Sequence, residues 1–361
     1  MHTIEELVQQ LVERGGSDLH ISAGAPPMVR INGRLVSLEQ DVLDPDSTKK
    51  LIYGILDNKQ ILRFERDAEL DMSFGITGLG RFRTNVFYQR GAIGAVLRVI
   101  PYDIKNLEEL GLPKDLCEEI CSRPKGLVLV TGATGSGKST TLASMIDYIN
   151  RTRNEHIMII EDPIEFVHRN KCCLVNQREV GSDTHGFKKA LRTALRQDPD
   201  VIMVGELRDQ ETIAAALTIA ETGHLTFATL HTNDVVQTIS RIIDVFPAHQ
   251  QQQIRTQLSF TVEAIFCQQL VVRSDNRGRA LAAEILTVTS AVRALIREDK
   301  THQLMSIIQT GGQHGMRTMN QALFDLYRTH EINYGDALGH SSDPEDLKRL
   351  LQKQSGTYKS A

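Results

Sequence analysis

GLVLVTGATGSGKST, residues 126–140, decides the fold of this chain of 361 residues. The segment begins with an apolar, β-branched run that predicts a buried strand. The helical spacing of apolar side chains from Thr140 to Asn150 predicts a helix. The glycine-rich stretch between them fits the pattern of a phosphate-binding loop. This pattern is informative only when a strand precedes it and a helix follows it, as they do here. The sequence therefore predicts an α/β fold of the P-loop NTPase class.

The loop contains the residue types that bind a phosphate. Its glycines let backbone N–H groups turn inward around a β-phosphate, and the helix N-terminus adds the positive end of its dipole. We expect Lys138 to reach the β- and γ-phosphates and the Ser139 hydroxyl to coordinate Mg²⁺. A chance glycine-rich turn would lack the flanking strand and helix. The residues predicted to bind the nucleotide are Gly132, Ala133, Thr134, Gly135, Ser136, Gly137, Lys138, Ser139 and Thr140.

The composition is that of an ordinary globular protein, with 41% hydrophobic residues, 24% charged residues and a formal net charge of −4. Without a run of Lys and Arg, this balance gives no support for nucleic-acid binding. No segment approaches the ~18 consecutive apolar residues of a membrane span, and the N-terminus has no apolar signal core. We therefore expect a cytoplasmic protein without membrane insertion. The five cysteines lack disulfide spacing, which favours reduced thiols over a metal site of Cys172, Cys173 and His168.

The first hundred residues predict a small α+β domain. Thr3 and Glu6 form a capping-box pattern at the start of a helix that runs to Val12. Asn32-Gly33 predicts a hairpin turn between two short strands. Helical spacing extends from Leu51 to Phe64, and three further strand-like segments follow up to Ile100. We place the end of this domain at residue 101.

Residues 101–113, which contain Pro101 and Pro113, predict a linker to a second domain that covers residues 102–361. After Gly126, strand and helix patterns alternate, which predicts parallel strands with crossover helices. The strands are expected at residues 126–131, 156–160, 201–204 and 225–230, and the helices at 187–195 and 212–221. A hairpin is expected at residues 270–286, and a helical C-terminal region at about 288–352.

Two of these strands end in carboxylates. The strand that begins at Ile157 is followed by Glu161, Asp162 and Glu165, at the edge of the sheet where α/β proteins bind ligands. We expect Glu165 to polarise the attacking water. The strand at 201–204 ends in Gly-Glu, and we expect Glu206 to act near Mg²⁺ through a metal-bound water. A solvated acidic turn is the alternative for the first cluster.

Two histidines and a set of arginines complete the candidate site. His231 follows the strand at 225–230 at its carboxyl end, where it is placed to sense a γ-phosphate, whereas His224 lies at the opposite end. Charge neutralisation during phosphoryl transfer requires cations. The first domain contains Arg81 and Arg83 on one face of a strand, together with Arg98. These arginines either solvate the surface or reach a nucleotide of their own or a neighbouring subunit.

Taken together, these motifs resemble those of the secretion ATPases of the type II/type IV pilus superfamily. Residues 132–140 match the family's Walker A motif, 161–165 its Asp box, 200–206 its Walker B motif and 222–231 its His box. Within the superfamily, the chain most resembles the pilus retraction ATPases, the PilT family. The segment from Ala291 to Glu298 resembles a signature helix of that branch, with departures at Val292 and Ala294.

The resemblance implies a PAS-like domain at residues 1–101 and a RecA-like ATPase domain at 102–361. It implies a homohexameric, Mg²⁺-dependent ATPase that drives pilus retraction and twitching motility, with ATP as the nucleotide. Arg81, Arg83 and Arg98 would approach the bound nucleotide. The motor would act in the cytoplasm on a platform protein of the inner membrane, at the base of the pilus machine.

Two alternatives remain at this point. The chain could form a ring that binds ATP, has low activity and assists a paralogous motor. It could also be a nucleic-acid translocase on the same core, which the 41 basic and 45 acidic residues do not favour.

Overall fold

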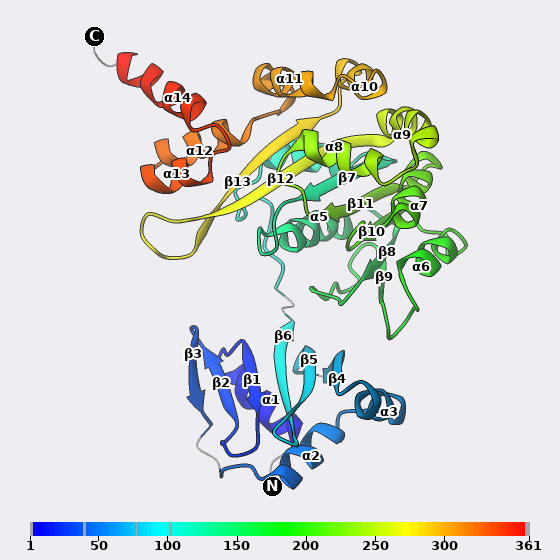
Figure 1. Ribbon diagram of the computed structural model, residues 1–361, viewed down its shortest axis with the longest axis vertical. Coiled ribbons are helices and arrows are strands. Elements are labelled where there is room, and N and C mark those ends of the chain that lie inside the picture. Colours follow the sequence, from blue (N-terminus) through cyan, green and yellow to red (C-terminus); the bar gives the residue numbers. More distant parts are fainter. Residues whose placement is uncertain (1–2, 39–40, 77, 101–102, 358–361) are drawn as a thin grey trace. The chain divides into compact units, whose positions relative to one another are not determined.

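The computed structural model describes residues 3–38, 41–76, 78–100 and 103–357 (Figure 1). The chain divides into two compact units. The first comprises Met1–Asp103 and Pro163–Val167, and the second comprises Ile104–Asp162 and His168–Ala361. The predicted domain boundary at residues 101 and 102 lies outside the described residues.

The first unit is an antiparallel sheet of six strands in the order β3-β2-β1-β6-β5-β4. Its strands are β1 (Asp18–Ile21), β2 (Met28–Ile31), β3 (Arg34–Ser37), β4 (Glu69–Ile76), β5 (Gly80–Gln89) and β6 (Ala92–Ile100). Its helices are α1 (Ile4–Glu13), α2 (Pro45–Tyr53) and α3 (Asn58–Asp67). The capping box at Thr3 and Glu6 is confirmed. So is the β2–β3 turn, where Asn32 and Gly33 have positive φ angles of 48° and 81°.

The helical spacing predicted from Leu51 to Phe64 is confirmed in part, because the stretch is not one continuous helix. The structure has α2, a break after Tyr53, and α3, which starts behind the N-cap residue Asp57. Asp57 and Gln60 form a second capping box, so the side chains that satisfy a helix start interrupt the apolar periodicity.

The second unit is a seven-stranded sheet in the order β13-β12-β7-β11-β10-β8-β9, with all neighbouring pairs parallel except β12 and β13. The predicted parallel strands are confirmed. The edge strand β9 and the part of β12 before Leu270 were not predicted. The strands are β7 (Gly126–Thr131), β8 (His156–Glu161), β9 (Leu174–Glu179), β10 (Val201–Val204), β11 (Leu225–Leu230), β12 (Val262–Val272) and β13 (Arg279–Thr287).

Helices cover both faces of this sheet, so its central strands are buried on both sides. Alternate residues of β7 show this division: Leu127 and Leu129 pack with α6 to α11, whereas Val128 and Val130 pack with α4 and α5. The helices of this body are α4 (Lys114–Cys121), α5 (Lys138–Thr152), α6 (Phe187–Ala194), α7 (Gln210–Glu221), α8 (Val235–Asp244), α9 (Ala248–Thr261), α10 (Ser290–Arg297) and α11 (Leu304–Thr310).

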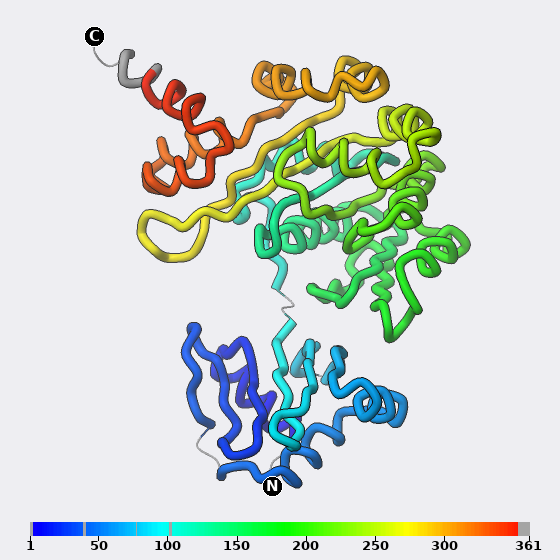
Figure 2. Tube along the Cα trace, viewed as in Figure 1, coloured from blue at the N-terminus to red at the C-terminus, as the bar shows by residue number. Residues whose placement is uncertain are grey.

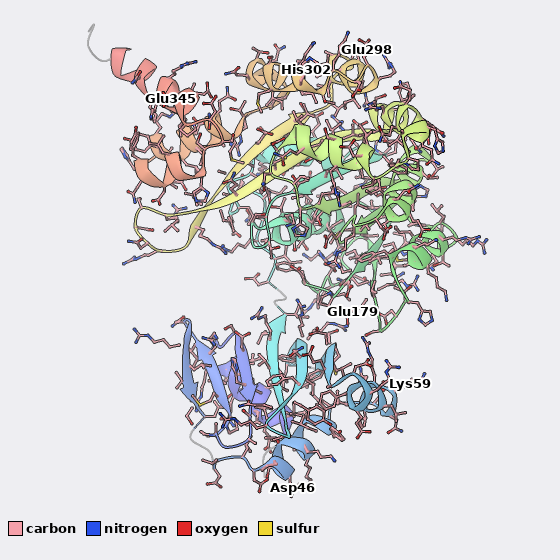
Figure 3. The ribbon with its side chains drawn as sticks, in the orientation of Figure 1. Asp46, Lys59, Glu179, Glu298, His302 and Glu345 are labelled. Atoms are coloured by element: carbon pink, nitrogen blue, oxygen red, sulfur yellow. The ribbon has the colours of Figure 1, made fainter. Side chains whose placement is uncertain are left out.

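The chain continues from α11 to three C-terminal helices, which can be followed from orange to red in Figure 2. These are α12 (Met319–Arg328), α13 (Tyr334–His340) and α14 (Pro344–Thr357). They pack on the β12–β13 hairpin through an apolar cluster that includes Val271, Ala282 and Leu323. In Figure 3, Glu298 and His302 mark the end of α10 and the turn behind it, and Glu345 marks the start of α14.

The fold class that the sequence predicts is therefore confirmed: an α+β unit with an antiparallel sheet, then a P-loop α/β unit with additional helices. In the described part of the chain, no helix is both long and apolar enough to cross a bilayer. Four of the five cysteines are buried, and Cys172 is exposed. Burial raises the pKa of Cys117 to about 12, so this thiol stays protonated at neutral pH.

A buried carboxylate holds the arginine-bearing strands of the first unit together. Asp18 accepts a hydrogen bond from Arg98 Nε at 2.8 Å and lies 3.9 Å from Arg30 Nε. Burial opposes ionisation of Asp18, but hydrogen bonds from Ser17 and Arg98 outweigh it and lower the pKa of this carboxyl.

Replacing Asp18 by Asn is expected to lower the stability of the first unit by about 1 kcal/mol at pH 7, because Arg98 is largely exposed and solvent screens the pair. The folded pKa of Asp18 is depressed, so its stabilising effect is present above the unfolded value of about 3.9. The stabilising effect is lost as the pH falls through the lower pKa that Asp18 has in the folded protein. Urea unfolding of the two proteins from pH 7 down to about pH 2 checks this, and a difference that does not shrink toward the acid end would contradict it.

Candidate phosphate-binding and catalytic site

The phosphate-binding loop lies between β7 and α5, as predicted. Gly132 and Gly137 have φ angles of 140° and 92°, a backbone conformation that L side chains rarely adopt. α5 begins at Lys138, so the free N–H groups of its first turn face the loop. Ser139 and Thr140 are half-buried in that first turn. The backbone thus forms an anion cradle at a helix N-terminus.

The loop has room and unused polar capacity for phosphate oxygens. Ser136 is buried, and its Oγ has no hydrogen-bond partner among the described residues. Ala133, Thr134 and Gly135 at the tip are exposed. A buried hydroxyl without a partner is costly unless a ligand satisfies it. These features fit a bound polyphosphate.

The two ends of the loop differ in their tolerance of a side chain. A Cβ added to Gly132 would lie 2.4 Å from Gln268 O and 2.6 Å from Ser136 Oγ, whereas one added to Gly135 would meet nothing within 4 Å. We expect Gly132→Ala to destabilise the protein by about 3 kcal/mol through overpacking and backbone strain. We expect Gly135→Ala to cost only about 1 kcal/mol, from the left-handed backbone alone. Chemical denaturation of both variants checks the order, and equal losses would contradict the packing argument.

The strand order brings the other predicted motifs to the loop. β11 lies beside β7 with Leu230 paired to Thr131, so His231 follows next to Gly132. β10 lies on the other side of β11, and Glu206 follows it. Because the strands are parallel, their carboxyl ends share one edge of the sheet.

At this edge, three predicted residues form one connected group. Lys138 is buried, and its Nζ donates to Gly132 O at 2.8 Å and to Ala133 O at 3.0 Å. The same Nζ lies 3.5 Å from His231 Nδ1. The other ring nitrogen, Nε2, lies 3.3 Å from Glu206 Oε1. The phosphate-binding lysine, the histidine and the acid at the end of β10 are thus linked through the imidazole.

A fourth residue, Arg208, orients the carboxylate of Glu206. Arg208 donates from Nε to Glu206 Oε2 at 2.8 Å. This hydrogen bond raises the pKa of Arg208. The sequence placed Arg208 next to the motif but did not predict the contact.

The carboxylates after β8 are arranged differently. Glu161 is the last residue of β8 and is buried, whereas Asp162 and Glu165 are exposed. Glu165 belongs to the segment Pro163–Val167, which groups with the first unit. No hydrogen bond or ion pair of Glu165 is found among the described side chains. His224, at the opposite end of β11, makes a local contact from its Nδ1 to Ile219 O at 3.1 Å.

The arginines of the first unit share one sheet face. Arg83 on β5 pairs with Arg98 on β6, which in turn pairs with Asp18 on β1, so the three side chains form a row. Arg81 lies two residues from Arg83 on the same face and donates to Ser73 Oγ at 2.5 Å. Arg83 and Arg98 are exposed.

The sequence analysis did not predict two residues that lie near the phosphate-binding loop. Arg279 on β13 donates to Gly135 O at 3.3 Å. Gln268 on β12 is buried and donates to Thr141 Oγ1 at 2.8 Å. Both contacts depend on β12 lying beside β7, and the sequence alone carries no signal for that order.

The strand–loop–helix cradle, with its lysine and the acid on a neighbouring strand, defines the chain as a P-loop NTPase. A family model for the type II/IV secretion system protein matches residues 1–331. The type IV pilus retraction ATPase PilT of Pseudomonas aeruginosa is 49% identical over 344 residues, which are 95% of this chain and 99% of that protein. The type IV pilus ATPase PilU of the same organism is 44% identical, over 96% of this chain and 91% of that protein.

Comparison with a solved structure points to the same family. The crystal structure of the pilus retraction motor PilT with bound ADP matches with a TM-score of 0.90 at 50% identity, and it covers 97% of this chain and 100% of the other. The chain belongs to the type II/IV secretion ATPases and, within them, to the PilT family.

Proposed function

We propose that this protein is a motor ATPase that hydrolyses ATP to drive retraction of a type IV pilus, and thereby twitching motility. The observation that carries the proposal is the connected group of Lys138, His231 and Glu206 beside the phosphate cradle. The similarity to PilT along nearly the whole chain supports the mechanical role.

Each residue of the site has a role in the proposal. The loop amides, the Ser136 hydroxyl and Lys138 bind the phosphates. Ser139 and Glu206 would hold Mg²⁺, Glu206 partly through water, and the ion would supply charge neutralisation. His231 contacts Lys138 and Glu206 together, so it is placed to respond to the γ-phosphate.

Two assignments remain to be tested as part of the proposal. Glu165 is the candidate for orienting the attacking water, because the carboxyl ends of parallel strands collect ligand-binding groups. Arg81, Arg83 and Arg98 are the candidates for neutralising charge on a nucleotide, of this subunit or of a neighbour. Their shared sheet face supports a joint role.

We further propose a homohexameric ring in the cytoplasm, at the inner-membrane base of the pilus machine. Hydrolysis would change the arrangement of two rigid units within each subunit, and the ring would pass this motion to a platform protein of the membrane. We propose no nucleic-acid partner and no membrane insertion.

The second candidate is a ring that binds ATP, turns it over slowly and assists a paralogous motor. Pseudomonas aeruginosa has two type IV pilus ATPases similar to this chain, PilT and PilU, so paralogues of this kind occur together in one organism. Steady-state hydrolysis by the purified chain, measured with its mass in solution, separates the two. Turnover that requires Mg²⁺ and stops with EDTA, from a particle of hexameric mass, supports the motor. A ring that binds nucleotide without appreciable turnover supports the assisting role and removes Glu165 as the water-orienting residue.

A further inference from the structure

A buried polar row crosses the sheet of the second unit beside the phosphate loop. Thr131, the last residue of β7, pairs with Cys267 on β12, and Cys267 pairs with Glu284 on β13. All three are buried, with exposed fractions of 2% or less. Directly opposite residues of neighbouring strands point to the same face. The row therefore runs from the phosphate loop to the outer strand of the β12–β13 hairpin.

Hydrogen bonds extend this row to the turn that carries His231. Thr131 Oγ1 donates to Cys267 Sγ at 3.1 Å, and Cys267 Sγ lies 3.9 Å from Thr238 Oγ1. Thr238 donates its own hydroxyl proton to Asp234 O at 2.7 Å. Thr232 Oγ1, 2.7 Å away, must then be a donor to Thr238. Thr232 follows His231 directly, so the chain of contacts joins both sides of the nucleotide site.

Glu284 connects the row to two helix starts. Its Oε1 accepts the N–H of Val235, the first residue of α8, at 2.9 Å. The backbone N–H of Met319, the first residue of α12, lies close enough to the same carboxyl to favour its charged form. Both helices already have an N-cap side chain, from Asp234 and Thr318. Glu284 thus bonds at the start of α8 to a donor that the Asp234 cap does not satisfy, and a negative charge is favourable near both helix N-termini.

The ionisation of Glu284 reflects opposing effects. Burial raises the pKa of Glu284, the two backbone N–H groups oppose this, and the nearby Asp234 carboxylate adds to it.

Hydrogen bonds of Arg317, the residue before the N-cap of α12, also connect that helix to β13. Arg317 forms a bridge with Ile285 through backbone hydrogen bonds of 2.8 and 3.1 Å, and its Nε donates to Ala283 O at 2.9 Å. A displacement of β13 at Glu284 therefore moves the start of α12. Since α12 packs with α13 and α14, the three C-terminal helices follow.

The geometry points to Glu284 as a positioning residue that couples the turn of His231 to the C-terminal helices α12–α14. A change of nucleotide at the phosphate loop moves His231 and α8, and Glu284 passes that movement to α12. The inference rests on the proposed nucleotide binding at this site. It goes beyond it by naming the helices that receive the signal and the side chain that transmits it.

The test compares the full-length protein with a Glu284→Gln variant by hydrogen–deuterium exchange, without nucleotide, with ADP and with a non-hydrolysable ATP analogue. Gln has no negative charge to place near the two helix N-termini, and with its oxygen on the Val235 N–H its NH₂ group turns a donor toward the Met319 N–H. In the unchanged protein, amides at the start of α12 are expected to respond to the nucleotide. In the variant, that response disappears while amides of the phosphate loop still respond.

Glu263→Gln is the matched control. Glu263 is a carboxylate on the same hairpin, paired with Arg123 and Arg293, and it contacts neither α8 nor α12. We expect the control to keep the α12 response. Thr238→Val removes the hydroxyl link without changing the shape, so it weakens the response and serves as the second variant if Glu284→Gln does not fold.

Kinetics separate positioning from a merely structural role. The Glu284→Gln variant is expected to lose kcat on the order of tenfold to a hundredfold with KM for ATP unchanged, because nucleotide still binds but the catalytic turn is misplaced. An α12 response in the variant equal to that of the unchanged protein would overturn the inference. So would a phosphate loop that responds in the unchanged protein without α12. If the phosphate loop itself fails to respond, the proposed nucleotide binding is what fails.

Discussion

A Glu206→Gln variant is expected to bind ATP and to lose turnover by a factor of about 10² to 10⁴, the range in which a positioned acid or base acts. Glutamine keeps the size of the side chain and can still contact the Arg208 guanidinium through its carbonyl oxygen. It loses the negative charge that faces His231 at 3.3 Å and that would help to hold Mg²⁺. Binding should survive because Lys138 and the loop amides are unchanged.

Phosphate release measures the turnover, and fluorescent-nucleotide titration measures the binding. Glu211→Gln is the control, because Glu211 lies shortly after Glu206 and forms an exposed ion pair with Lys188. The control should keep full activity. A Glu206→Gln protein with more than a tenth of the normal rate would remove Glu206 from the catalytic group.

A Lys138→Ala variant is expected to lose both binding and turnover. The ammonium group is the buried cation in the cradle, and a hydrogen bond to a charged partner contributes about 1.5–3 kcal/mol. Two such bonds to phosphate oxygens amount to about 3–6 kcal/mol, but they replace the two bonds of Lys138 to loop carbonyls, so we expect binding to weaken by a factor on the order of 10². Calorimetric titration with ATP and with ADP measures the loss.

The conservative variant tests the geometry as well as the charge. Lys138→Arg keeps the cation, but the site is buried and holds a compact ammonium between two carbonyl oxygens. A planar guanidinium does not fit there. We therefore expect Lys138→Arg to be nearly as inactive as Lys138→Ala, whereas Lys125→Ala, an exposed lysine before β7, should have no effect. An active arginine variant would show that charge alone suffices.

Much of the second unit could be predicted because its signals are local. The apolar runs of β7, β10 and β11 each end in a polar motif, and parallel pairing alone brings such ends together. Thus Lys138, Glu206 and His231 could be chosen before their contacts were known. The strand order could not be predicted, since it depends on long-range packing. For that reason Arg279 and Gln268, which reach the loop from the hairpin, were missed.

The failures have local causes too. Gly54 and the Asp57 cap divide a stretch whose apolar spacing alone is helical throughout. The edge strand β9 has only two apolar residues, Leu174 and Val175, among its six, which is too weak a signal to separate it from a loop. For Glu165, the sequence showed its distance from β8 along the chain but not the path of the segment. Which unit such a segment joins is a tertiary property.

The hydrogen bonds from Lys138 to its own loop affect the rate at which the product of ATP hydrolysis can leave the site. The ammonium has two good acceptors within its own loop, the carbonyls of Gly132 and Ala133. An arriving phosphate therefore exchanges one pair of partners for another, and only the difference counts toward affinity. When the product departs, the lysine returns to those carbonyls and is not left as a bare buried cation. This internal substitute lowers the barrier to product release, the step that limits many enzymes whose work is done by moving parts.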